Sequence, residues 1–483
     1  MINSAPARAG RPLRTPPPRA AVPRPRSDGS SRTPGWAVAV PPALLMLVFG
    51  LWGVTREGTL WGDEAVTYDM ARRTVPEIWR TLGSVDAVHG LHYLLMHGVF
   101  TAWEPGLVPL RLPSVLGMSA TAAGVALIGR HLAGPRAGLL AGLVLTTLPV
   151  VHRYAQEGRS YALVCALVTW GSWLLLRRRW VAYAGVMLLA CLLHEFAVLT
   201  VVAHGVTVWQ QRKEHRARGW VVAAGCVCAG LAPLALFSVT QSSQVEWIEP
   251  PETRDFIALV LLAALGWACS RNPAGARVRS LALPLLVLPT ALLLLVSKVH
   301  PLFVDRYVLP YVVGLALLLG AALDHYWTRA LAWSAVAGAL VVLVSHGPFL
   351  RTPDSRKNDV GAVASAVAEV AHPGDGLLFA PARRRSYALV HAAPYARLHD
   401  VSLDRSRRAS GTLFGTEASP AQVRTRMLSE PRIVAVQDLR GQPLDSEQVE
   451  RTKRDVLRES FALAEERVVD QVRIGVYVRR ATG

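Results

Sequence analysis

The chain has 483 residues, of which 52% are hydrophobic and only 18% are charged, and its mean hydropathy is +0.30. So small a charged fraction over this length excludes an ordinary soluble globular protein. The net charge of +18 could suggest nucleic-acid binding. However, the arginines lie in short loops between apolar segments and in the N-terminal tail, with no basic stripe interleaved with aromatic residues. This follows the positive-inside rule and argues against nucleic acid as a partner.

Residues 1–35 hold seven Arg and eight Pro, which predicts a disordered cytoplasmic tail. The apolar segment 36–54 is too long for a typical signal-peptide core and lacks a clear cleavage site. We therefore expect a retained first transmembrane helix.

Further apolar segments follow, at residues 112–129, 137–151, 161–176, 180–210, 220–240, 256–270, 281–297, 308–323 and 330–346. About 20 apolar residues span a bilayer as a helix. With 180–210 taken as a helical hairpin, the chain has eleven transmembrane helices. This count places every strongly cationic short loop in the cytoplasm and residues 56–110 outside, as a first outer loop. Within that loop, residues 89–103 are too short to span and predict a juxtamembrane or re-entrant helix.

Residues 351–483 are soluble in character and lie outside by the same count. We expect helices at 358–370 and 446–466 and strands at 376–380, 432–437 and 472–478. The predicted fold class is therefore an α-helical polytopic membrane protein with a small C-terminal extracytoplasmic α/β domain. Residues 36–350 form the transmembrane domain.

Several familiar signatures are absent from the sequence. The five cysteines all lie in apolar segments, which favours small membrane-buried residues over disulfides or metal ligands. A Walker loop, a convincing G-x-G-x-x-G and a G-x-S-x-G are all missing. The sequence therefore gives no support for an ATP-driven protein, a Rossmann-fold enzyme or a serine hydrolase.

Ionisable residues cluster in the predicted outer loops, where they tend to mark function. Asp63 and Glu64 follow the first helix, and one of them could remove a proton from an acceptor hydroxyl. By itself such a pair is more typical of a solvated loop.

Three further outer loops carry candidate residues. Arg159 could pair with a phosphate, and Glu157 could orient it or bind a sugar hydroxyl; an interfacial ion pair explains them equally well. His194 ends an apolar helix beside a glutamate, where a packed polar residue is the plainer interpretation. Arg306, with Lys298 and His300, could form an anion cradle or anchor the chain to lipid headgroups.

Taken in order, these pieces resemble the GT-C glycosyltransferases, in particular bacterial protein O-mannosyltransferase-like enzymes. The resemblance covers about residues 36–350. It rests on the order and shared membrane face of five motifs: Trp61-Gly62-Asp63-Glu64, the stretch from His89 to His97, Arg111-Leu112-Pro113-Ser114, the stretch from Tyr154 to Tyr161, and the stretch from Asp305 to Pro310.

The resemblance implies a polyprenyl-phosphate sugar donor and an active site in the first outer loop, at the outer membrane surface. It implies Asp63 as the catalytic base with Glu64 beside it, and a donor-phosphate site drawn from Glu157, Arg159 and Arg306. To this site we add His194, from its place in the neighbouring outer turn. The transferred sugar would be a hexose, with mannose first, and the anomeric centre would invert. The acceptor could be a glycan, a lipid or a protein. Related enzymes differ in metal dependence, so a divalent metal is possible but no metal ligands are assigned.

Two other functions compete with this one. A transporter or lipid flippase would also be polytopic, but such proteins often have internal repeats and charges near the bilayer midplane. No such repeat is visible, and the charges here gather at one face. A membrane anchor for an active C-terminal domain is the third possibility, although that domain shows no catalytic constellation.

Overall fold

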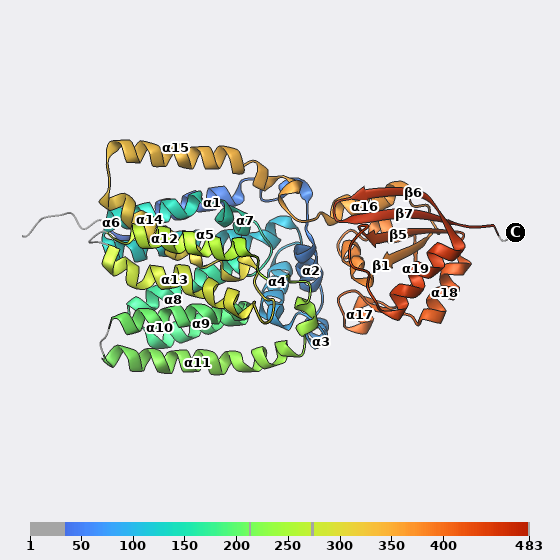
Figure 1. Cartoon of the computed structure of the whole chain (residues 1–483), viewed down its shortest axis with the longest axis horizontal. Coiled ribbons are helices and arrows are strands. Elements are labelled where there is room, and N and C mark those ends of the chain that lie inside the picture. The colour runs from blue at the N-terminus through green and yellow to red at the C-terminus, as the bar shows by residue number, and fades with distance from the viewer. Residues whose placement is uncertain (1–33, 212–213, 272–274, 482–483) are drawn as a thin grey trace, which may run out of the picture.

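A computed structural model describes residues 34–211, 214–271 and 275–481. The predicted tail, residues 1–35, therefore lies almost wholly outside the described residues. Figure 1 shows a bundle of long helices that run side by side at one end of the molecule and a smaller domain with a β-sheet at the other.

The bundle contains most of the helices. Its members are α1 (Gly35–Leu51), α5 (Leu107–Ala133), α6 (Pro135–Thr147), α7 (Pro149–Ala155), α8 (Tyr161–Leu176), α9 (Trp180–Leu193), α10 (Val198–Gln210), α11 (Glu214–Val239), α12 (Thr253–Cys269), α13 (Gly275–Val296), α14 (Tyr311–His325) and α15 (Arg329–His346). Helices α6 and α7 meet at 69°, where Pro149 begins the second helix.

If α6 and α7 form one bent segment, the described residues contain the eleven predicted helices. By length and hydropathy, five of the described helices and the bent pair are able to cross a bilayer, and α8, α9 and α14 are shorter apolar helices. The chain is thus an α-helical polytopic membrane protein. Helix α15 stands apart from the rest and has no buried residue (Figure 1).

The two ends of the bundle differ in charge. Residues near the ends of α5, α8, α10 and α13 line one common cavity at the cationic end, and Arg136 pairs there with Asp324 at 3.4 Å. The other end carries residues 56–110 and the C-terminal domain (Figure 1). This separation agrees with the predicted alternation of loops. Which end faces the cytoplasm stays a prediction.

The first outer loop folds into α2 (Gly62–Ala71), α3 (Val75–Leu82) and α4 (Gly90–Ala102). Thr74 and Glu77 form a capping box that begins α3. The predicted short helix at residues 89–103 is α4. It packs on α2, where the rings of Tyr68 and Phe100 meet edge to face at 5.2 Å.

The C-terminal domain contains a five-stranded sheet in the order β2-β1-β5-β7-β6. Its strands are β1 (Gly376–Ala380), β2 (His399–Asp400), β5 (Arg432–Asp438), β6 (Phe461–Val469) and β7 (Val472–Arg479). The first three strands are parallel, and β7 and β6 are antiparallel to their neighbours. Helix α16 (Val360–Val370) packs on one face, and α18 (Pro420–Ser429) and α19 (Gln448–Ser460) pack on the other. The predicted strands at 376–380, 432–437 and 472–478 and the helix at 358–370 are present.

The predicted helix at residues 446–466 is wrong in its second half. Helix α19 ends at Ser460, and β6 begins at Phe461. Beyond Ser460 the chain pairs with β7 through a tight turn at Asp470, which has φ 59°. Exposed charged residues suit both a solvated helix and the open face of an edge strand. Only the pairing with β7 distinguishes the two, and that is a non-local contact.

The sheet and the first outer loop share one hydrophobic core. Ala65 of α2, Met96 of α4 and Leu110 of α5 belong to the same buried cluster as Val367 of α16 and Phe379 of β1. The C-terminal domain is therefore packed onto the outer loop, and its position is fixed relative to α2.

Candidate active site

Glu64 lies in the first turn of α2 and is fully buried. Arg111 binds both carboxylate oxygens, since Nε donates to Oε1 at 2.8 Å and Nη2 donates to Oε2 at 2.7 Å. Arg56 also pairs with this carboxylate, and the Gly158 amide donates to Oε1 at 2.9 Å. Burial raises the pKa of Glu64, but the two guanidinium groups lower it more strongly, to about 2. This geometry favours a structural role over the catalytic one predicted for it beside Asp63.

Asp63 precedes Glu64 on α2 but is accessible, with 34% of its side chain exposed. Nη2 of Arg306 lies 3.6 Å from Oδ2 of Asp63. The start of α2 is fixed from the C-terminal side, because Oδ1 of Asn358 accepts a hydrogen bond from the Gly62 amide at 2.8 Å. A carboxylate is favoured at a helix N-terminus. Asp63 is therefore an accessible, ionisable group held in a fixed place beside a cation.

Arg306 lies in the short turn Asp305–Val308 before α14 and is largely buried. Its Nε donates to the hydroxyl of Tyr161 at 3.0 Å. Its guanidinium carbon also lies 5.5 to 5.9 Å from four ring centroids, those of Trp61, Tyr161, Trp247 and Tyr307. Cation–π contacts hold a cation without neutralising it. Arg306 therefore presents a fixed positive charge toward Asp63.

Arg159 is buried in the loop between α7 and α8. Its Nη1 lies 3.5 Å from the carbonyl oxygen of Asp63, 3.4 Å from the hydroxyl of Tyr93 and 3.3 Å from that of Thr67. These partners are neutral and the contacts are long. Its Nε has no hydrogen-bond partner among the described residues. Arg159 is thus a second cation beside Asp63, and its Nε is able to donate a further hydrogen bond.

Glu157 is buried two residues before Arg159. Its Oε2 lies 4.0 Å from Nε of Arg356, and its Oε1 has no hydrogen-bond partner within the described ranges. Burial raises the pKa of Glu157 to about 7, although Arg356 favours the ionised form. Near neutral pH this carboxyl group can therefore be either protonated or ionised.

The raised pKa of Glu157 predicts a pH-dependent stability. Protonation favours the folded state, so this contribution is complete below pH 4.5, the ordinary pKa, and is lost as the pH rises through about 7. A change of one in pKa corresponds to about 1.4 kcal/mol. The rise of the pKa of Glu157 from 4.5 to about 7 therefore gives a full loss of about 3 kcal/mol. Glu157→Gln mimics the protonated form. The melting temperature of this variant should therefore rise relative to that of wild type as the pH increases from 5 to 8. Thermal unfolding in detergent measures this, and the exposed Glu104→Gln should track wild type. Parallel curves for Glu157→Gln and wild type would contradict the prediction.

His194 ends α9 and is buried, with its ring 4.6 Å from the ring of Tyr307. Burial, together with the nearby positive charges of Arg159 and Arg306, lowers the pKa of His194 to about 3. The ring is therefore neutral and can offer a hydrogen bond to a phosphate but no charge.

A cavity of about 410 Å³ opens beside His194. Its walls include Tyr307, His300 and apolar side chains such as Phe196 and Leu302. The third member of the predicted anion cradle, Lys298, instead places Nζ 4.6 Å from the ring centroid of Phe256.

The structure brings residues from four separate loops to one end of the bundle, namely Asp63, Glu64, Glu157, Arg159, His194 and Arg306. Sequence reasoning missed the partners that hold them. It named Arg111 only as part of a motif and assigned no site role to Arg356, Lys357 or Asn358, which follow the last bundle helix. A charged run directly after an apolar helix was the available signal.

Lys357, which follows the last bundle helix, lies near Arg306. Its Nζ lies 5.6 Å from the ring of Trp247, which also contacts Arg306. Two arginines from separate chain segments, Arg159 and Arg306, thus lie beside the accessible carboxylate of Asp63.

Comparison with solved structures shows that the fold of this chain is the GT-C fold. Two crystal structures of ArnT from Cupriavidus metallidurans align with it. The apo-state structure gives a TM-score of 0.57 at 15% sequence identity. The structure bound to undecaprenyl phosphate gives 0.53 at 14% identity. Each alignment covers 93% of this chain and 98% of the other.

At this identity the likeness establishes the fold. No family model matches the chain, and no curated protein does so either.

The described residues provide no evident metal centre. Nowhere among them do three or more His, Cys, Asp or Glu side chains converge as metal ligands would. At Asp63 the nearest cation is the guanidinium of Arg306. The divalent metal that the resemblance left open is therefore assigned no ligands among the described residues.

Proposed function

We propose that the protein is a membrane glycosyltransferase that moves a sugar from a polyprenyl-phosphate donor to an acceptor at the outer face of the membrane. One observation carries the proposal: the accessible carboxylate of Asp63 lies beside Arg306 and Arg159, next to a partly apolar cavity. The fold supports it, and the aligned ArnT structure with bound undecaprenyl phosphate supports the donor class.

The donor's phosphate would bind Arg306 and Arg159, both within reach of Asp63. A guanidinium pairs with phosphate through two parallel hydrogen bonds, and Arg159 retains an unpartnered Nε for this purpose. The cavity of about 410 Å³ beside His194 would take the first part of the polyprenyl chain. Its mixture of apolar walls and polar ends matches a lipid phosphate.

The reaction we propose is a single displacement. Asp63 takes the proton from an acceptor hydroxyl as the hydroxyl oxygen forms a bond to the anomeric carbon. The bond from that carbon to the phosphate oxygen breaks, and the electron pair leaves with the lipid phosphate. Arg306 and Arg159 stabilise the charge that develops there. Attack opposite the leaving group inverts the anomeric centre.

The finer details rest on the motif resemblance. We propose a hexose as the transferred sugar, with mannose first, and a glycan, lipid or protein as the acceptor. We also propose that the N-terminus is cytoplasmic and that residues 351–483 are extracytoplasmic, which places the cluster where nucleotide sugars are not supplied. A lipid-borne donor suits that location.

The test is transfer by the purified full-length protein. Polyprenyl-phosphate mannose and a panel of other polyprenyl-phosphate sugars would be supplied with glycan, lipid and peptide acceptors. We expect release of polyprenyl phosphate and a new glycosidic bond for at least one pair. The absence of transfer with every donor would contradict the proposal and favour a transporter or flippase.

Arg306→Gln should lower kcat/KM for the donor by about 10- to 100-fold, because a charged hydrogen bond contributes about 1.5–3 kcal/mol. Arg306→Lys keeps the charge but loses the planar fork and the contact with Tyr161, so it should recover only part of the loss. Steady-state kinetics with varied donor measure both variants. Arg254, exposed and paired only with Glu252, provides the matched control Arg254→Gln. Wild-type kinetics in Arg306→Gln would remove Arg306 from the donor site.

A further inference from the structure

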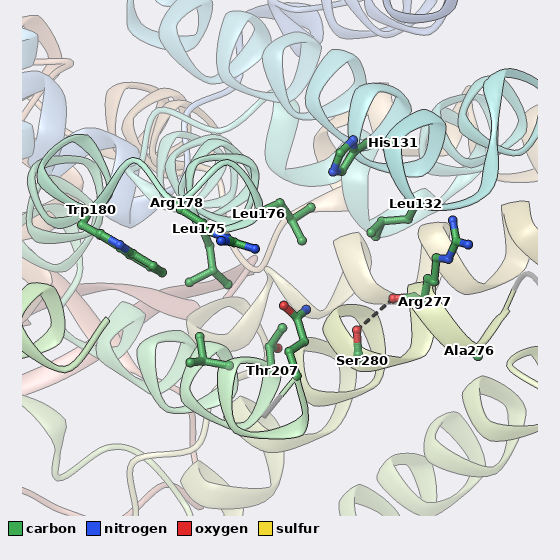
Figure 2. A pocket seen from close by; sticks show the side chains of 12 residues that line it. His131, Leu132, Leu175, Leu176, Arg178, Trp180, Thr207, Ala276, Arg277 and Ser280 are labelled. Carbon is green, nitrogen blue, oxygen red and sulfur yellow. Dashed lines mark hydrogen bonds between the residues drawn. The ribbon is translucent and has the colours of Figure 1, made fainter. Parts of the chain in front are cut away.

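A second cavity, of about 480 Å³, lies at the end of the bundle away from Asp63 (Figure 2). Helix α5 connects the two ends. Arg111, near its start, binds Glu64, and His131, near its end, lines the cavity. At 1.5 Å per helical residue, those twenty residues span about 30 Å. The cavity therefore belongs to a different site from the charged cluster.

Polar side chains reach this cavity from several helices. Figure 2 shows Arg178 beside Trp180 on one side, Arg277 with Ser280 on another, and His131 from α5 on a third. The Ser280 hydroxyl donates to the Arg277 carbonyl at 2.9 Å, which fixes the first turns of α13.

Within the described ranges, the positive charge of this cavity has no acidic counterpart. No acidic residue is among the described residues that line the cavity, and neither Arg178 nor Arg277 has an ion-pair partner within the described ranges. Other arginines at this end are engaged: Arg136 pairs with Asp324 at 3.4 Å, and Arg177 lies 4.6 Å from the Trp173 ring. Two unpaired guanidinium groups on one cavity attract an anion.

Arg178 also has an unusual backbone. Its φ of 56° lies in the left-handed region, which costs a non-glycine residue roughly 1–2 kcal/mol. This conformation belongs to the turn that terminates α8, in which the Arg178 amide donates to the Leu175 carbonyl and the Arg179 amide donates to the Leu174 carbonyl. The turn places Arg178 two residues beyond Leu176, the end of α8, where it lines the cavity.

The remaining walls are apolar. Leu132, Leu175, Leu176 and Val208 line the cavity together with its polar groups. A small soluble anion would gain nothing from four aliphatic side chains. A phospholipid would, because its phosphate is followed within a few atoms by acyl chains. Basic pockets between transmembrane helices commonly bind anionic lipid headgroups.

We propose that this cavity binds the headgroup phosphate of an anionic phospholipid. Arg178 and Arg277 pair with the phosphate, and the leucines contact the upper acyl carbons. This inference is independent of the proposed transferase function, because about 30 Å of α5 separates Arg111, at the charged cluster, from His131, in the cavity.

The experiment uses the purified full chain in detergent, titrated with phosphatidylglycerol or phosphatidylcholine and read by native mass spectrometry. Wild type should bind phosphatidylglycerol about tenfold more tightly than phosphatidylcholine. The double variant Arg178→Gln/Arg277→Gln should lose this preference. Arg218→Gln, an exposed arginine on α11 that does not line the cavity, should retain it.

Three results would overturn the proposal: equal binding of the two lipids by wild type, an undiminished preference in the double variant, or an equal loss in Arg218→Gln. Inorganic phosphate and glycerol 3-phosphate, each at millimolar concentration, form a further arm. Neither should displace bound phosphatidylglycerol; displacement would assign the cavity to a soluble anion instead. If the double variant fails to fold, Arg178→Lys replaces it and should weaken phosphatidylglycerol binding several-fold, because lysine lacks the bidentate fork. Unchanged binding in Arg178→Lys would then count against the site.

Discussion

Asp63→Asn should lower the rate of sugar transfer by about 10² to 10⁴, the range lost when a general base is removed. Asparagine keeps the size of the side chain and its place at the start of α2 but cannot accept the acceptor's proton. The neighbouring Arg306 loses its 3.6 Å partner and becomes freer to bind donor phosphate. We therefore expect kcat to fall while the KM for the donor stays level or decreases.

Initial rates with varied donor separate these two parameters. The matched control is Asp404→Asn, an exposed aspartate of the C-terminal domain, which should transfer at the wild-type rate. Transfer at an undiminished kcat in Asp63→Asn would show that the base is another group. A higher donor KM at constant kcat would instead assign Asp63 to binding.

Glu64→Gln should destabilise the fold by about 3–5 kcal/mol, the cost of leaving buried charge unpaired. The change removes the negative charge that Arg56 and Arg111 share inside the protein. The pKa of Glu64 lies at about 2, below its ordinary 4.5, so the stabilising contribution is complete above pH 4.5 and is lost as the pH falls toward 2. At neutral pH the variant thus loses the whole contribution.

Thermal unfolding in detergent at pH 7 measures this effect, with Glu57→Gln as the control. Glu57 is exposed and lies one residue after Arg56 in the same loop. A melting temperature of Glu64→Gln equal to that of the control would contradict the structural role. If the Glu64→Gln variant is as stable as the control but no longer transfers sugar, Glu64 would again be a candidate catalytic residue.

The sequence predicts the bundle well because its signal is local. Apolar length marks each helix, and arginine-rich loops such as 177–179 mark one end. The same reasoning identifies Asp63 and Arg306 as outer-loop charges, yet it cannot rank Asp63 against Glu64. Both are acids in one helical turn, and only burial against Arg111, 47 residues further on, separates them.

Long-range contacts explain the rest of what sequence reasoning missed. The amide of Gly62 is held by Asn358, 296 residues away in the sequence. Glu157 meets Arg356 in the same way, and the pairing of β6 with β7 overrides a helical pattern at Phe461. Such partners have no local signature, since each residue looks like ordinary loop charge until the chain is folded.

The core shared between the sheet and the first outer loop bears on the order in which the protein forms. The ribosome synthesises α2 early, whereas Val367 and Phe379 are added about 300 residues later. Contacts so distant in the chain form slowly, because a long loop must first close. The start of α2, which carries Asp63, is thus completed by a residue that is added 296 positions after Gly62. A nascent or truncated protein would carry every charged loop of the bundle and still lack a finished site.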